Sequence, residues 1–145
     1  MNTLRASREH LNHLTPLFNG YRVFYKQESN PAAAKAFLQE RFEKQDSVIF
    51  LAQDENGNAL GFTQLYPSFS SVAMKRVYIL NDLFVTPEAR GQQVGTALLE
   101  QAKSFAQEQG ARGLVLETGA DNPAQKLYEK NGWTQDPALH YYWEV

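Results

Sequence analysis

The stretch Leu83-Phe-Val-Thr-Pro-Glu-Ala-Arg-Gly-Gln-Gln-Val-Gly-Thr-Ala-Leu-Leu99 decides the fold of this chain. Its first three residues are typical of the end of a strand, and Thr86-Pro87 ends that strand because proline cannot donate to a sheet ladder. Apolar residues at helical spacing from Val94 to Phe105 predict an amphipathic helix behind the turn. A strand, a glycine-bearing turn and a helix N-terminus in succession favour phosphate binding, because unpaired backbone N–H groups point outward there.

This turn alone does not establish a function, since an ordinary strand–loop–helix connection contains the same glycines for its geometry. The spacing matches neither Gly-x-x-x-x-Gly-Lys-Ser/Thr nor Gly-x-Gly-x-x-Gly. A nucleoside triphosphate or a dinucleotide is therefore not the expected ligand.

Two blocks of sequence resemble one known family. Leu-Phe-Val-x-Pro-x-x-Arg-Gly-x-x-Val-Gly-x-x-Leu-Leu, from Leu83 onward, is similar to the acetyl-CoA motif of the GCN5-related N-acetyltransferases (GNAT). The block from Asp121 to Trp133, which contains Asn-Pro-Ala-x-x-Leu-Tyr, is similar to that family's second marker. The blocks stand in the family's order and separation, so the resemblance covers nearly the whole chain. One position departs from the pattern: the family usually has glycine where this chain has Gln93, whose side chain would either crowd the pyrophosphate or point away from it.

The resemblance implies a mixed α/β fold. We expect a twisted, mostly antiparallel sheet, with one parallel strand pair splayed for acetyl-CoA and helices on both faces. The length of 145 residues indicates a single domain, 1–145.

The composition of the chain limits the kinds of molecule that it is expected to bind. A net charge of −2 with mixed signs argues against nucleic acid and against a polybasic membrane surface. Because the chain has no cysteine, disulfides, thiolate metal sites and a cysteine nucleophile are excluded, and we expect no metal. No apolar run approaches the length of a membrane span and no signal peptide is recognisable, so the cytoplasm is the expected location.

Local patterns predict the remaining elements. Apolar spacing from Arg8 predicts a helix that Pro16 kinks or restarts, and Asn30-Pro31 predicts the start of a second helix. Asn122-Pro123 predicts the cap of a short helix, with Gln125 completing a capping box. The expected strands are 1–6, 47–52, 59–66, 74–85 and 113–118, the last parallel to 74–85, followed by a final hairpin around Asp136-Pro137.

The resemblance also implies the residues that bind and activate acetyl-CoA. The backbone N–H of Val85 would polarise the thioester carbonyl, and Tyr128 would protonate the departing thiolate. The alternative for Tyr128 is a core tyrosine, and that for Asn122 is helix capping. The expected cofactor-binding residues are Leu83, Phe84, Val85, Arg90, Gly91, Gln92, Gln93, Val94, Gly95, Thr96, Asn122 and Tyr128.

Asp82 is the candidate general base. Strand alternation predicts Leu80, Asp82 and Phe84 on one face of the sheet, where apolar neighbours would raise the pKa of the carboxyl. A structural role, with tyrosine or backbone partners, explains the same residue equally well. Histidines at 10, 13 and 140 compete only if the fold brings one inward.

The acceptor is the least specified part of the reaction. In the resembling family the first two helices wall the acceptor site, which makes Tyr21, Tyr25 and Glu28 candidates for substrate contact; core aromatics and a solvated glutamate are the alternative.

Three segments, Asn81 to Val85, Gln64 to Ser71 and Tyr21 to Tyr25, are similar to the fungal Hpa2-like branch of the family, which points to a primary amine as acceptor. Because the chain has no cysteine to carry an acyl group, we expect the amine to attack acetyl-CoA directly. That branch oligomerises, and an aromatic C-terminal strand with Trp143 would support a homodimer. A non-catalytic acyl-CoA sensor or a protein-interaction domain remains the alternative function.

Overall fold

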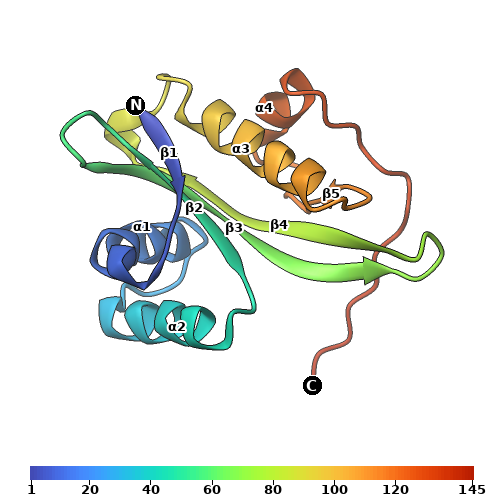
Figure 1. Cartoon of the computed structure of the whole chain (residues 1–145), viewed down its shortest axis with the longest axis horizontal. Coiled ribbons are helices and arrows are strands. Elements are labelled where there is room, and N and C mark those ends of the chain that lie inside the picture. Colours follow the sequence, from blue (N-terminus) through green and yellow to red (C-terminus); the bar gives the residue numbers. More distant parts are fainter.

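Five strands form one twisted sheet in the order β1-β2-β3-β4-β5, in a computed structural model that describes residues 1–145 (Figure 1). Each neighbouring pair is antiparallel except β4 and β5, which are parallel. The predicted fold class is therefore confirmed. The strands are β1 (Asn2–Arg5), β2 (Val48–Gln53), β3 (Ala59–Ser70), β4 (Lys75–Val85) and β5 (Leu114–Val115).

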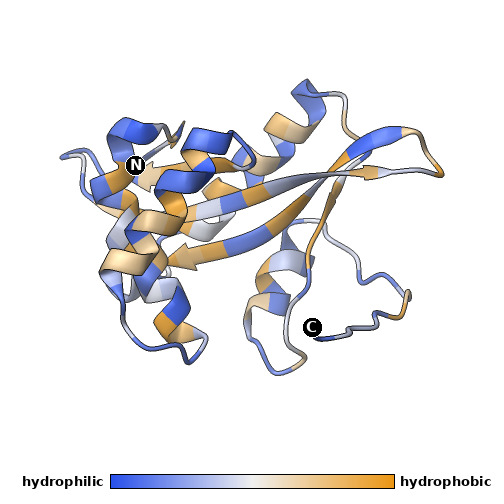
Figure 2. Ribbon diagram, turned by 90° about the horizontal axis from the view of Figure 1, so that it is seen from below, coloured by the Kyte–Doolittle hydropathy of each residue, from blue (hydrophilic) through white to orange (hydrophobic).

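Helices cover both faces of the sheet (Figure 1). One face lies under α1 (Leu11–Phe24) and α2 (Pro31–Lys44), where Leu14, Leu38 and Phe62 are fully buried. The other face lies under α3 (Val94–Glu108), where Leu98 and Leu99 are fully buried. The short α4 (Ala124–Lys130) lies beside α3, and the single turns η1 (Arg8–His10) and η2 (Pro87–Ala89) precede α1 and α3. Hydrophobic residues gather where helices and sheet meet (Figure 2), which makes two cores separated by the sheet.

The start of α2 follows the predicted chemistry. Asn30 Oδ1 accepts a hydrogen bond from the backbone N–H of Ala33 at 3.1 Å, and Pro31 occupies the first helical position. In α1, by contrast, one continuous helix runs through Pro16 to Phe24. The aromatic residues Tyr21 and Phe24 therefore lie on its last turns.

Three local predictions are wrong. The parallel strand is only two residues long, and no hairpin forms around Asp136-Pro137. The chain does turn there, since Asp136 Oδ1 accepts from Ala138 N–H at 2.9 Å, but the segments on either side do not pair. Gln125 forms no capping box, because its Nε2 donates instead to the carbonyl of Ala120 at 2.6 Å. None of the helices is both long enough and apolar enough to cross a membrane.

Candidate active site

A β-bulge at Asn81 determines on which face of the sheet the candidate base, Asp82, lies. In the β3–β4 ladder Gln64 pairs with Asp82 and Leu65 pairs with Leu80, so Asn81 is an extra residue on β4. The predicted grouping of Leu80, Asp82 and Phe84 on one face is wrong, because the extra residue reverses the alternation. Leu80 packs in the core under α3, whereas Phe84 packs in the core under α1 and α2.

The same region of β4 separates from its parallel neighbour. Pairing with β5 is confined to Tyr78 and Ile79, although β4 continues to Val85. Thr86 N–H donates back to Leu60 O at 2.9 Å, so alternation turns the backbone groups of Val85 and Leu83 away from β3. The end of β4 therefore has a free strand edge on the β5 side.

The N-terminus of α3 lies directly after this edge. No side chain caps it, no acidic residue lies in its first turn, and the first helical hydrogen bond runs from Ala97 N–H to Gln93 O at 3.1 Å. The N–H groups before Ala97 have no partner within the helix, and the helix dipole adds partial positive charge there. This arrangement suits an anionic group such as a diphosphate.

Two residues of the loop have left-handed backbone conformations. Gly91 has φ 78° and Gln93 has φ 64° and ψ 20°. The position where the family usually has glycine is thus one where glycine is favoured physically, and the exposed Gln93 accepts a conformation that costs L-residues about 1 kcal/mol or more.

Contacts inside the site fix the loop against the strand and α4. Arg90 Nε donates to Val85 O at 3.1 Å, and the Arg90 guanidinium lies 5.8 Å from the centre of the Phe84 ring. A Cβ at Gly95 would lie 3.0 Å from Leu127 of α4, so this glycine allows α3 and α4 to approach closely.

Tyr128 lies near Tyr25, and Tyr25 in turn contacts Asn122. Burial, reinforced by the nearby Tyr25, raises the pKa of Tyr128 to about 12. Asn122 Nδ2 lies 3.4 Å from the Tyr25 hydroxyl, while its Oδ1 accepts from Ala124 N–H at 2.9 Å. Asn122 therefore contacts both the start of α4 and Tyr25, and the Tyr128 hydroxyl stays protonated at physiological pH.

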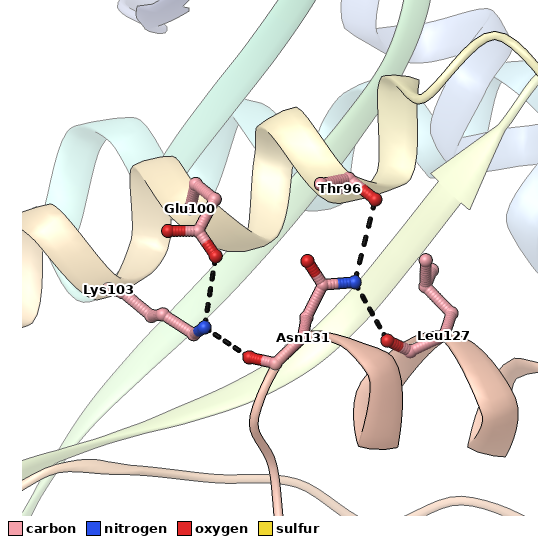
Figure 3. A network of polar contacts seen from close by, with 5 residues as sticks. All are labelled: Thr96, Glu100, Lys103, Leu127 and Asn131. Carbon is pink, nitrogen blue, oxygen red and sulfur yellow. Dashed lines mark hydrogen bonds and ion pairs between the residues drawn. The ribbon is translucent and has the colours of Figure 1, made fainter.

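A polar network docks α4, which carries Tyr128, onto α3 (Figure 3). Asn131 Nδ2 donates to Leu127 O at 2.8 Å and lies 3.5 Å from Thr96 Oγ1. Lys103 Nζ donates to Asn131 O and pairs with Glu100 at 2.9 Å. The hydroxyl of Thr96, expected at the diphosphate, thus contacts Asn131.

Asp82 is 1% exposed on the α1 face of the sheet. Its Oδ2 accepts from Gln64 Nε2 at 2.6 Å and its Oδ1 accepts from Asn81 Nδ2 at 2.8 Å. Burial raises the pKa of the Asp82 carboxyl, although these two bonds and the nearby Tyr21 hydroxyl act to lower it. An amine cannot touch a carboxylate this deep, so any proton must arrive through a hydroxyl or a water.

Tyr21 is the neighbour that reaches Asp82. Its hydroxyl donates to Asn81 O at 3.1 Å, and burial together with the Asp82 charge raises the pKa of Tyr21. Burial and Asp82 likewise raise the pKa of Tyr66, on β3. Glu28 is not brought to this cluster: it is exposed in the α1–α2 loop and forms no ion pair or side-chain hydrogen bond.

Three polar residues of the cluster were not among the predicted site residues: Gln64, Tyr66 and Asn81. The bulge makes them neighbours of Asp82 by shifting the register of β3 against β4. The only sequence signal was the polar pair Asn81-Asp82 inside an otherwise apolar strand.

Comparison with known proteins identifies the class. Residues 12–133 match the model of the acetyltransferase (GNAT) family. The chain is 50% identical over 143 residues to the uncharacterized N-acetyltransferase YhfO of Bacillus subtilis, covering 98% of this chain and 95% of that protein. It also superposes on the crystal structure of a probable acetyltransferase with TM-score 0.95 and 45% identity, covering 100% of this chain and 98% of the other.

The chain belongs to the acetyltransferase (GNAT) family and is an acetyl-CoA-dependent enzyme by class. A weaker similarity, 36% identity over 87 residues, links 59% of this chain to 54% of the D-amino-acid N-acetyltransferase HPA3 of Saccharomyces cerevisiae. The free edge of β4 and the uncapped start of α3 fit the amide-rich arm and the diphosphate of acetyl-CoA.

Proposed function

We propose that this protein transfers the acetyl group of acetyl-CoA directly to a primary amine, with both substrates bound together, and that residues 1–145 act as one domain. The observation that carries the proposal is the bulge at Asn81. Beyond this bulge the edge of β4 that faces β5 is unpaired, and Asp82 lies on the face of the sheet that α1 covers.

Acetyl-CoA supplies an acyl group activated as a thioester. In our proposal the backbone N–H of Val85 donates to the carbonyl oxygen, where negative charge develops during attack. Tyr128 donates its proton to the departing sulfur, and the absence of cysteine supports direct transfer without an acyl-enzyme. Leu83 and Val85 hold the amide-rich arm, and the loop from Arg90 to Thr96 holds the diphosphate.

We propose that Asp82 takes up the amine proton through the Tyr21 hydroxyl or a water. A buried carboxyl with a raised pKa is a better base near neutral pH than an exposed one. Tyr21 and Tyr25 wall the acceptor site with ring centres 5.0 Å apart, and aromatic faces attract ammonium groups. The name of the yeast relative, a D-amino-acid N-acetyltransferase, supports a small amine or an amino acid as the acceptor, as expected for the Hpa2-like branch.

The experiment measures release of CoA thiol from acetyl-CoA with polyamines, D-amino acids and lysine peptides, against an amine-free control. We expect amine-dependent release from at least one class, and Tyr128→Phe to lower kcat by about 10²-fold or more. Acetyl-CoA at a hundredfold excess over its Kd should stabilise the fold by roughly 2.7 kcal/mol. Stabilisation without transfer to any amine would instead favour an acyl-CoA sensor.

We further propose a homodimer built by the C-terminal segment, residues 134–145. β5 is the edge of the sheet, and a groove lined by Gly113, Leu114 and Thr134 runs beside it. The segment that carries Tyr141 to Trp143 has no secondary structure of its own. An added strand from a second copy would pair with this edge and cover those side chains.

A further inference from the structure

A second cavity lies at the opposite end of α3 from the cofactor loop. Its volume is about 460 Å³, and it sits where β1 ends at Arg5 and β2 begins after Ser47. The residues that follow α2 and α3, Gln45 and Gln109, complete its rim. At about 1.5 Å of rise per residue, Gln109 lies roughly 20 Å along the helix from the first turn of α3. None of the proposed cofactor, base or acceptor residues lines this cavity.

Four arginines and no carboxylate line it. The lining arginines are Arg5, Arg8, Arg41 and Arg76. Carboxylates outside the lining pair with two of them, since Arg8 lies 2.8 Å from Glu43 and Arg41 lies 3.3 Å from Asp46. Arg5 and Arg76 form no ion pair and no side-chain hydrogen bond.

These two arginines stack on aromatic rings instead of pairing with carboxylates. The guanidinium of Arg5 lies 5.2 Å from the centre of the Phe105 ring, and that of Arg76 lies 4.3 Å from the centre of the Phe69 ring and 5.9 Å from that of Tyr78. The Phe105 and Tyr78 rings meet edge to face at 66°, with their centres 5.0 Å apart, and both residues are buried. The charges of Arg5 and Arg76 are therefore not neutralised by any carboxylate of the chain.

We propose that this cavity binds a small organic anion. Its carboxylate groups bind Arg5 and Arg76, the two lining arginines that have no carboxylate partner. Guanidinium groups match carboxylates in charge and geometry, and the cavity volume is that of ordinary small-molecule sites. Ser7 and Ser47 supply further hydroxyl donors. The site is independent of the acetyl-transfer residues, so the inference stands whether or not the proposed acceptor is right.

Calorimetric titration with phthalate, a benzene ring with two carboxylates, tests the proposal. We expect saturable binding that remains when acetyl-CoA is saturating, and no binding of neutral phthalamide. Arg5→Gln and Arg76→Gln should each weaken phthalate binding by about tenfold. Arg22→Gln is the matched control, because Arg22 lies on α1 outside the cavity, and it should leave the affinity unchanged.

A fourth variant separates loss of the site from loss of the fold. Gln109→Glu keeps all four arginines and places a carboxylate at the rim, where it competes with the ligand. It should weaken phthalate binding with little change in Tm. Phthalate displaced by acetyl-CoA, or bound equally by the Arg5→Gln and Arg76→Gln variants, would place the anion at the start of α3 and overturn the proposal. No saturable binding would overturn it as well.

Discussion

At the residue scale, Asp82 combines deep burial with a titratable carboxyl. The surroundings raise its pKa, so the folded state holds the proton more tightly than the unfolded state does. Stability then falls as pH rises from about 4, the ordinary value, through the native pKa. Each unit of pKa difference corresponds to about 1.4 kcal/mol at pH values above both.

Asp82→Asn removes this titration and keeps an acceptor for Gln64 Nε2. We expect the free energy of unfolding of the variant, minus that of the wild type, to increase with pH above about 4. Urea unfolding between pH 4 and 7.5 measures this difference. The altered bond to Asn81 adds an offset that does not depend on pH, so the slope is the readout. A flat or falling difference would contradict the raised pKa.

Gln93 offers a second residue-scale prediction. Its φ of 64° costs a residue with a side chain about 1 to 2 kcal/mol, while glycine there adds unfolded-chain entropy worth about 0.5 to 1 kcal/mol. Gln93→Gly should therefore raise the free energy of unfolding by about 0.5 to 1 kcal/mol, measured by urea unfolding. The neighbouring Gln92 does not have a positive φ, so Gln92→Gly should lower it by a similar amount. Equal effects of both variants would contradict the argument.

At the element scale, the position of α4 depends on a few polar contacts as well as on packing (Figure 3). Asn131→Ala removes the bonds of Nδ2 to Leu127 O and Thr96 Oγ1 and should destabilise the fold by about 1 to 2 kcal/mol. Glu100→Ala is the control. It removes only an exposed ion pair with Lys103 and should cost about 0.5 kcal/mol or less. Thermal unfolding measures both, and a larger loss for Glu100→Ala would contradict this view of α4.

Local chemistry in the sequence predicted most elements but not where strands change register. The cap at Asn30 and the strand–loop–helix from Leu83 to Leu99 follow from short-range rules, and both are confirmed. The bulge at Asn81 depends on which β3 residue faces which β4 residue, so no short-range pattern specifies it. Because that one residue reverses the alternation, the prediction that Leu80 shares a face with Asp82 and Phe84 was wrong. The membership of Asp82 in the site, and that of Tyr128, Tyr25 and Glu28, stay predictions.

At the scale of the whole molecule, the C-terminal segment is notable because the rest of the chain leaves its large apolar side chains uncovered. Leu139, Tyr141, Tyr142 and Trp143 are 80%, 91%, 87% and 82% exposed. Single exposed apolar residues are common, but four within five positions are the reason for proposing an interaction surface here. The predicted hairpin is absent here because the segments before and after Asp136-Pro137 pair neither with each other nor with β5. The cytoplasmic location stays a prediction at this scale too.

Deletion of residues 138–145 should convert a homodimer into a monomer, because it removes the apolar surface that a second copy would cover. Light scattering coupled to size exclusion measures the mass of each form across protein concentrations. Val115→Lys tests the other side of the same contact, since Val115 lies half exposed on the edge strand β5 and a charge there opposes strand addition. Val72→Ser is the control, because Val72 is the same apolar residue type and is even more exposed (95% against 50%) but lies at the tip of the β3–β4 hairpin. If the wild type is a monomer at high concentration, or if Val72→Ser dissociates the dimer and Val115→Lys does not, the C-terminal segment does not join two copies through β5.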